Sequence, residues 1–431
     1  MKNDPDPGPN GPPAAGAINR RDLILAGLAG LVFVAYALFE FWNNWAVDFS
    51  AYYYAGRFFH LGEVAQIYAG PPAIIGPEMP ARWVDMVAAD GFADERTYPF
   101  IYLPWVAWFM APIAASAPPL AAMNVSLLIN IAATLLSVVL AWRLFAASTR
   151  LSFGLWALLS LGVLILSALS IMALTLGQIQ IPVFTMILLA FERYRAGKVV
   201  LAAVLLAGAT MMKITPAAFA IIFLWDLNWR ALGTYVGTTL ALLGVSIGVA
   251  GWELHAQYFD IMSKLSAQLF MANIGASLEA FVYQLVDLAR GTAPHYQGFE
   301  VSVPRPGWLD PVVKGVFVVG LGAIWTVTRR LPDDRRLPEQ LFALAILLPL
   351  CTPLGWIHYY LLAVYMLPAL FARREIVTYL LFFGFLALTT LWVMYGMILI
   401  EGPVMVQVMI YVPYFVALLV RVITHGTAAR D

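Results

Sequence analysis

The chain has 431 residues, of which 62% are hydrophobic and only 12% are charged. Soluble domains carry about 25% charged and at most about 50% apolar residues, so the composition excludes a soluble globular protein and indicates one that crosses a membrane several times. The net charge of zero argues against nucleic-acid binding, and the single cysteine, Cys351, rules out an internal disulfide.

The N-terminal segment 1–22 is rich in Pro and Gly, which predicts a disordered cytoplasmic tail. It contains Arg20 and Arg21, and the apolar run Leu23–Trp42 follows directly. This run is long enough to span a bilayer and ends without a small-residue cleavage pattern. We therefore expect a retained first transmembrane helix and not a signal peptide.

The next segment, Val47–Tyr68 (VDFSAYYYAGRFFHLGEVAQIY), combines a carboxylate with a run of tyrosines. Phe49–Leu61 has the pattern of an amphipathic interfacial helix, and Asp48 could simply cap it. A cap does not explain the adjacent Tyr52 and Tyr53, whose rings are suited to binding a sugar. A carboxylate beside such rings is the usual general base for a sugar hydroxyl, so both interpretations stay open.

The rest of the sequence predicts an all-α polytopic membrane protein. If most Lys and Arg are placed in the cytoplasm, every apolar run but one must cross the membrane once. The exception is the run 101–115, which must either enter the membrane without crossing it or lie at the interface. The result is about twelve transmembrane helices in a single domain, 23–425, with cytoplasmic termini and a short C-terminal tail, 426–431. Two long outer loops, 43–119 and 253–310, carry interfacial or re-entrant segments. The apolar runs after the first are approximately 101–115, 120–143, 152–174, 178–192, 199–213, 216–227, 231–251, 311–328, 340–352, 356–371, 376–399 and 404–421.

Polar residues interrupt this apolar pattern at a few points, and the predicted topology places them on the same outer face as Asp48. They include Gly177-Gln178, the segment Lys213–Pro216 and the segment Gly355–His358. Charge and non-helical backbone at membrane depth are tolerated only where they line a protein-filled or water-filled cavity. Their convergence predicts one outward-opening site.

Each of these polar residues also has a purely structural interpretation. Pro216 breaks a helix just after Lys213, so the lysine is predicted at an outer hairpin apex, where it either snorkels to the interface or binds a phosphate. His358 is either a structural histidine whose hydrogen bonds are satisfied within the protein or a residue that donates hydrogen bonds to a phosphate. Gln178 either satisfies the broken backbone or bonds a sugar, and Arg57 contacts either a lipid headgroup or the donor phosphate.

The sequence has no glycine-rich nucleotide loop, zinc-ligand spacing or GxSxG elbow. An Asp-X-Asp pair, which would hold a divalent ion on a sugar nucleotide, occurs only as Asp4-Pro-Asp6 in the predicted tail. This argues against a soluble sugar nucleotide as the donor of any sugar transfer on the outer face.

Five segments together resemble glycosyltransferase family 87, whose members are membrane enzymes of the GT-C fold that use polyprenyl-phosphate mannose. In chain order they are DFSAYYYAGRFFHLGEVAQIY, TYPFIYLPWVAWFMAPIA, LGQIQIP, MMKITPAAF and GWIHYY. The resemblance implies a GT-C-type fold with Asp48 as catalytic base. It also implies that Lys213, Trp356 and His358 belong to the lipid-phosphate end of the cavity. The family often has a second histidine where this chain has Tyr359.

We therefore expect a glycosyltransferase that moves a mannose-like hexose or pentose from a polyprenyl-phosphate donor to an acceptor hydroxyl of a glycan or glycolipid. A single displacement assisted by Asp48 would invert the anomeric configuration. Three cations would stabilise the departing phosphate: Lys213, His358 and Arg57. The residues expected to contact the sugar or the acceptor are Tyr52, Tyr53, Gln178 and Trp356.

The expected location is a bacterial-type inner or plasma membrane, with the site on its periplasmic or extracellular side. Phosphate is already a good leaving group, so we expect no metal and no other cofactor. One alternative is a transporter or flippase of a lipid-linked sugar, although such proteins bind near the midplane between repeated halves and no repeat is evident. Another alternative is a ligase or polymerase that acts on lipid-linked glycans.

Overall fold

The computed structural model describes residues 18–69, 79–296, 300–372 and 375–425. The predicted C-terminal tail, 426–431, and residues 1–17 of the predicted N-terminal tail, 1–22, lie outside the described residues. The last residues of that N-terminal tail, Arg20 to Asp22, form the first turn of a helix and are not disordered. The first helix, α1, begins at Arg20, three residues before the expected apolar run. Asn19 caps it, because its side-chain oxygen accepts a hydrogen bond from the Asp22 N–H at 2.9 Å.

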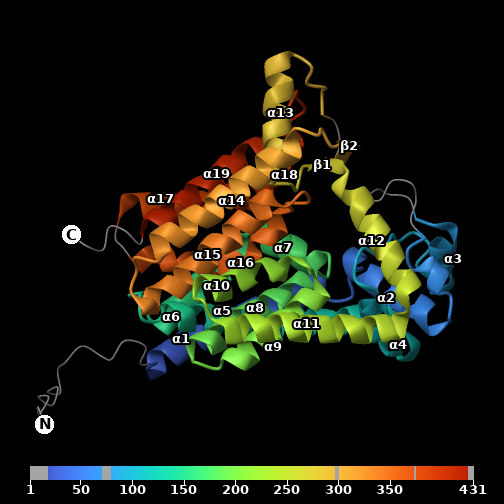
Figure 1. The fold of residues 1–431 in the computed structure, drawn as a ribbon, viewed down its shortest axis with the longest axis horizontal. Coiled ribbons are helices and arrows are strands. Elements are labelled where there is room, and N and C mark those ends of the chain that lie inside the picture. The colour runs from blue at the N-terminus through green and yellow to red at the C-terminus, as the bar shows by residue number, and fades with distance from the viewer. Residues whose placement is uncertain (1–17, 70–78, 297–299, 373–374, 426–431) are drawn as a thin grey trace, which may run out of the picture.

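The described chain is almost entirely helical, with short 3₁₀ turns (η) between some helices (Figure 1). The first part contains α1 (Arg20–Phe41), α2 (Val47–His60), η1 (Val64–Gln66), α3 (Ala81–Ala89), α4 (Pro104–Ser116), α5 (Pro119–Phe145), α6 (Phe153–Leu166) and α7 (Ala168–Thr175). The middle contains α8 (Gln180–Arg195), α9 (Val199–Met212), η2 (Thr215–Ala220), α10 (Ile221–Trp225), α11 (Trp229–Ala250), α12 (Trp252–Ser266), β1 (Gln268–Ala272) and α13 (Leu278–Arg290). The last part contains β2 (Glu300–Pro304), α14 (Leu309–Thr328), α15 (Asp333–Cys351), η3 (Ile357–Tyr360), α16 (Leu361–Met366), η4 (Leu367–Ala372), α17 (Ile376–Thr389), α18 (Leu391–Ile398) and α19 (Val406–His425).

Five of these helices, α1, α5, α11, α14 and α19, are long and apolar enough to cross a membrane. The pair α7 and α8 passes the same test together but is bent by 115° at Leu176–Ile179, and several apolar helices of 10–17 residues accompany them. Together these segments indicate a multi-pass membrane protein. The count of about twelve spans stays a prediction.

One element departs from the all-α expectation. Within the outer loop 253–310, β1 and β2 form a two-stranded antiparallel sheet in which Gln268 lies opposite Pro304. The β2 sequence EVSVP alternates valine with polar residues, which is the period-two pattern of a strand and gives no helical apolar stripe.

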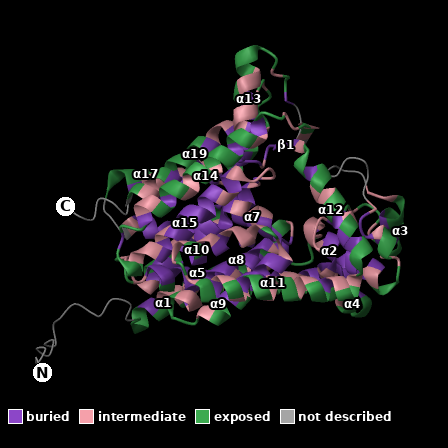
Figure 2. Ribbon diagram, viewed as in Figure 1, coloured by how far each residue is buried: buried purple, intermediate pink, exposed green. Residues whose placement is uncertain are grey.

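The apolar interior has two parts. The larger one runs through the central bundle, which Figure 2 shows as a continuous buried region. A second apolar cluster joins α2, α3, α4 and α12 at one end of the molecule. The close packing of α2 on α4 depends on Gly56, since a Cβ there would lie 2.7 Å from the backbone of Met110. The candidate site lies where α2 meets the central bundle.

Candidate functional site

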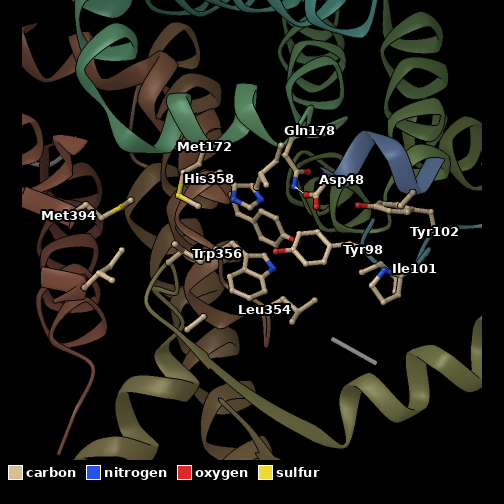
Figure 3. A pocket seen from close by; sticks show the side chains of 17 residues that line it. Asp48, Tyr98, Ile101, Tyr102, Met172, Gln178, Leu354, Trp356, His358 and Met394 are labelled. Atoms are coloured by element: carbon tan, nitrogen blue, oxygen red, sulfur yellow. Dashed lines mark hydrogen bonds between the residues drawn. The ribbon is translucent and has the colours of Figure 1, made fainter. Parts of the chain in front are cut away.

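A cavity of about 380 Å³ collects side chains from segments that are far apart in the sequence (Figure 3). Its walls come from the first turn of α2, the segment before α4, the α7–α8 break, the end of β1, the segment around η3, and α18. Its polar and aromatic lining residues are Asp48, Tyr98, Tyr102, Gln178, Trp356, His358 and Tyr359. Aliphatic and thioether side chains, among them Met172 and Met394, complete the wall on the side away from Tyr102.

The N-terminus of α2 is tied to the α7–α8 break by its backbone. The N–H groups of Asp48 and Phe49 both donate to the carbonyl oxygen of Leu176, at 3.1 and 3.2 Å. The break itself needs a glycine, because Gly177 has φ +66° and a Cβ there would lie 2.7 Å from the Cβ of Ala46. The Leu-Gly-Gln sequence therefore builds the turn that holds Asp48 in place.

The Asp48 side chain does not cap its helix. The N-cap of α2 is Ala46, with no side-chain capping bond, and the Asp48 carboxylate accepts a hydrogen bond from the Gln178 side-chain amide instead. Asp48 is half-buried and faces the cavity. Burial raises its pKa to about 7, while the charge of Lys213 and the bond from Gln178 act to lower it. A carboxyl with such a pKa can accept a proton near neutral pH.

Lys213 stands at the helix break that Pro216 predicted. Helix α9 ends at Met212, and η2 begins at Thr215. The ammonium lies over the ring of Tyr359, 4.2 Å from its centroid. Tyr359 lines the cavity and Lys213 does not, so the lysine acts on the cavity as a nearby positive charge.

His358 is buried, with 2% of its surface exposed, and its ring faces the cavity in Figure 3. Neither ring nitrogen has a hydrogen-bond partner among the described residues. The side-chain amide oxygen of Gln178 is also buried, and it too has no hydrogen-bond partner among the described residues. Buried polar groups are nearly always bonded in native proteins. Because His358 and Gln178 also line the cavity, these atoms are suited to bonding a ligand there.

The segment that carries Trp356 and His358 is clamped by the chain after β1. The Ala276 N–H donates to the Gly355 carbonyl at 2.7 Å, and the Ile357 N–H donates to the Ile274 carbonyl at 2.8 Å. Gly355 is required here, since a Cβ would lie 2.6 Å from the carbonyl oxygen of Pro349. The two segments thus present Trp356 and His358 to the cavity on a fixed backbone.

The remaining candidates on α2 lie elsewhere. Arg57 forms an ion pair with Asp90, which also accepts a hydrogen bond from the Tyr54 hydroxyl at 3.1 Å. Tyr53 donates to the carbonyl oxygen of Ala117 at 2.8 Å. Neither Arg57 nor Tyr53 lines the cavity, and their partners account for them as contacts between α2 and its neighbours.

Tyr52 lies just behind the cavity wall. It is 1% exposed and does not line the cavity, but its ring packs 4.4 Å from that of Tyr102, which does. Sequence reasoning did not single out Tyr102 or Tyr359 as site residues. The signal for Tyr102 was its place in TYPFIYLP, four residues after Tyr98, and Tyr359 had been noted only as a departure from the family pattern.

The cavity thus brings together a carboxylate with a raised pKa, a nearby ammonium, an imidazole that has no hydrogen-bond partner in the described chain, and several aromatic rings. Among the residues that the structure describes, no group of three or more His, Cys, Asp and Glu could hold a metal ion. The arrangement can remove a proton, stabilise an anion and pack against a ring.

A multi-pass helical protein with such a cavity has the features of a membrane sugar transferase. The profile of glycosyltransferase family 87 matches residues 100–353, which is more than half of the chain. The protein belongs to glycosyltransferase family 87 and is a membrane glycosyltransferase. The matched range includes Gln178 and Lys213, while Asp48 and His358 lie outside it. No curated protein matches the chain.

Proposed function

We propose that the protein transfers a sugar from a polyprenyl-phosphate donor to an acceptor hydroxyl, with inversion at the anomeric carbon and Asp48 as general base. The observation that carries this proposal is the Asp48 carboxylate, held by Gln178 at a cavity whose His358 nitrogens have no partner in the described chain. This reaction class needs a base and an anion-stabilising donor at one cavity, and Asp48 and His358 are the side chains that support these two roles.

The chemical step is a single displacement. The acceptor hydroxyl loses its proton to Asp48, and its oxygen forms a bond to the anomeric carbon as the bond from that carbon to the phosphate oxygen breaks. The electron pair of the broken bond stays on the phosphate, so polyprenyl phosphate leaves as an anion. A positioned general base contributes about 10²–10⁴-fold to such a step.

The phosphate would lie where Lys213 and His358 act on it. The Lys213 charge is near Asp48 and over the ring of Tyr359, and the His358 imidazole offers an N–H to the cavity. Fixed cations and donors stabilise developing charge without reorganising. Because Arg57 is engaged by Asp90, we leave it out of this phosphate site.

The lipid tail and the sugar would occupy opposite sides of the cavity. Met172, Met394 and Ile398 supply an apolar wall toward α18, which suits a polyprenyl chain, whereas Asp48, Gln178 and Tyr102 lie on the other side. The sugar would bind against Tyr98, Tyr102 and Trp356. Aromatic rings bind the apolar face of a pyranose, and the Gln178 amide oxygen is free to accept from a hydroxyl.

The test is transfer by the purified protein in lipid nanodiscs. A panel of radiolabelled polyprenyl-phosphate sugars is offered with octyl glycosides as acceptors, and Asp48→Asn serves as the matched control because it keeps the side-chain shape. We expect a labelled product from at least one donor, and loss of at least about 100-fold in Asp48→Asn. Near-normal turnover in that variant would contradict the base assignment.

The same assay separates the alternatives. Movement of the labelled lipid between leaflets without any product would favour a flippase. Product formed only from a glycan on a lipid pyrophosphate would favour a ligase or polymerase. The first result would overturn the proposed transfer reaction, and the second would overturn the proposed donor.

A further inference from the structure

The outer segment that joins α12 to α13, residues 266–279, shapes the cavity that Asp48 faces in two ways. It passes through β1 between the labels α12 and α13 in Figure 1. Its residues Ala272 and Ile274 line the cavity directly. Its backbone at Ile274 and Ala276 also makes the two hydrogen bonds that hold the chain before and after Trp356. The place of this segment therefore sets two walls of the cavity at once.

The same segment also holds the 3₁₀ turn η3, which carries His358. The Tyr360 hydroxyl donates to the carbonyl oxygen of Ala276 at 2.7 Å, and both residues are fully buried. Tyr360 and His358 belong to this one short turn. A displacement of the segment would therefore displace the imidazole as well.

Arg305, the residue after β2, joins the two ends of the segment. At one end its backbone N–H donates to the carbonyl oxygen of Ala267 at 2.9 Å, and its Nη1 donates to that of Ser266 at 3.4 Å. At the other end its Nη2 donates to Glu279 Oε2 at 2.8 Å, and its Nε lies 2.5 Å from Oε1. Its Nη1 also lies 2.9 Å from a carboxylate oxygen of Asp310, in the first turn of the long apolar helix α14.

The Glu279–Arg305 pair is buried outside the cavity. The Glu279 side chain is 1% exposed and that of Arg305 is 12% exposed, and neither residue lines the cavity. Removing one partner of a buried ion pair leaves the other charge buried and uncompensated. The remaining partner would then turn toward water and release the end of the segment that it holds.

We propose that Glu279 and Arg305 are positioning residues of the transfer reaction, which act on the donor through His358. The proposal rests on the proposed function and adds that the outer segment 266–279 sets the place of the imidazole against the phosphate. Asp48 is held separately, because its backbone N–H bonds to the α7–α8 break. The pair therefore controls the donor side of the cavity and leaves the acceptor and the base unaffected.

The test compares Glu279→Gln with the wild-type protein in the transfer assay, with donor and acceptor concentrations varied in turn. We expect kcat/KM for the donor to fall about tenfold, because the hydrogen bond from His358 to a charged phosphate is partly lost. The KM for the acceptor and the dependence of the rate on pH should not change. The matched control is Glu192→Gln, in the last turn of α8, where a 6% exposed carboxylate pairs with Arg143 and Arg193. This control should lower thermal stability and leave the donor parameters as they are.

A double-mutant cycle distinguishes positioning from a general loss of structure. If Glu279 acts through His358, Glu279→Gln should cost little more once His358→Gln has removed the imidazole. An additive loss in the double variant, or an equal rise in the KM for donor and acceptor, would overturn the proposal. Arg305→Lys keeps the charge but not the planar fork, so it should show the same donor effect in smaller measure. It takes the place of Glu279→Gln if that variant does not fold.

Hydrogen–deuterium exchange in nanodiscs tests the same coupling without any transfer. In Glu279→Gln the amides of 353–360 should exchange at least about tenfold faster than in wild type, because the bonds that hold this chain are loosened. Exchange at the N-terminus of α2 should stay as it is, and Glu192→Gln should leave both regions unchanged. Faster exchange confined to 266–279 and 353–360 supports the positioning role even if no donor is accepted, in which case the proposed function alone fails. Unchanged exchange in Glu279→Gln overturns the positioning role.

Discussion

Helix α2 carries two polar groups, one at each end, and the structure treats them differently. Near its C-terminus, Arg57 and Tyr54 both bond to the carboxylate of Asp90, which follows α3. At its N-terminus, Asp48 bonds to Gln178 and faces a cavity into which buried polar atoms of Gln178 and His358 project without partners in the described chain.

The difference distinguishes polar groups that hold the fold together from polar groups that are available to a ligand. Burying a polar group without a hydrogen bond costs free energy, so unpartnered polar atoms in the wall of a cavity are expected to bond to whatever fills it. In the group around Arg57 the polar side chains are paired within the protein, and they hold α2 against the segment that carries Asp90. The Asp48 group is incomplete, which is the condition expected of a binding site before its ligand arrives.

The most direct test of this comparison makes the same substitution, aspartate to asparagine, in each of the two polar groups. Asp48→Asn should lower transfer by about 10²–10⁴-fold, because the base is gone, while the protein stays folded. Asp90→Asn should instead lower the free energy of unfolding by roughly 1–3 kcal/mol and leave the chemical step intact. The measurements are kcat with a fixed donor and thermal unfolding in nanodiscs. Strong loss of kcat in Asp90→Asn, with normal stability, would contradict the distinction.

Lys213→Ala should weaken the donor by about ten- to over a hundredfold, because we expect the ammonium to reach past Tyr359 to the bound phosphate, and such a charge-assisted contact contributes roughly 1.5–3 kcal/mol. Lys213→Arg should recover only part of this affinity, because a planar guanidinium does not replace a compact ammonium. Donor Kd by equilibrium binding checks the prediction, with Arg57→Gln as the matched control that removes a cation already paired with Asp90. Normal donor binding by Lys213→Ala, with only reduced thermal stability, would make the lysine a snorkelling residue.

A smaller effect on stability follows from the raised pKa of Asp48. Its pKa is about 7 in the folded protein and near 3.8 when unfolded, so the folded state holds the extra proton between these values. Stability therefore falls as the pH rises from about 4 to about 7, and it is then level. Asp48→Asn removes this dependence and should melt at a higher temperature than wild type at pH 8, with the difference shrinking toward pH 4. Parallel melting curves across this range would show that Asp48 has an ordinary pKa.

Sequence reasoning found the features that depend on local chemistry. Pro216 predicted that α9 ends near Lys213, and the apolar runs predicted a helical, membrane-spanning protein. What it could not predict are contacts between distant segments. Arg57 and Lys213 look alike in sequence, each a lone cation in an apolar or aromatic context. Only the fold pairs the first with Asp90 and sets the second over the ring of Tyr359.

Gln178 gives the smallest and most specific prediction. Its amide N–H₂ donates to Asp48, 130 residues away in the sequence, while the sugar contact that we propose for it uses the amide oxygen. A hydrogen bond donated to a carboxylate favours the charged form, and this one lowers the pKa of Asp48 against the larger opposing effect of burial.

In Gln178→Leu the pKa of Asp48 should therefore rise further above about 7. Since transfer needs the ionised carboxylate, the acidic limb of the rate against pH should move to higher pH by up to about one unit. The rate at pH 9 should fall much less than the rate at pH 7, because the base can still ionise there. Gln180→Leu, which changes a neighbouring buried glutamine outside the cavity, is the matched control and should leave the limb where it is. A uniform loss at every pH in Gln178→Leu would mean that the residue contacts the sugar alone, since a lost sugar contact does not change the ionisation of Asp48.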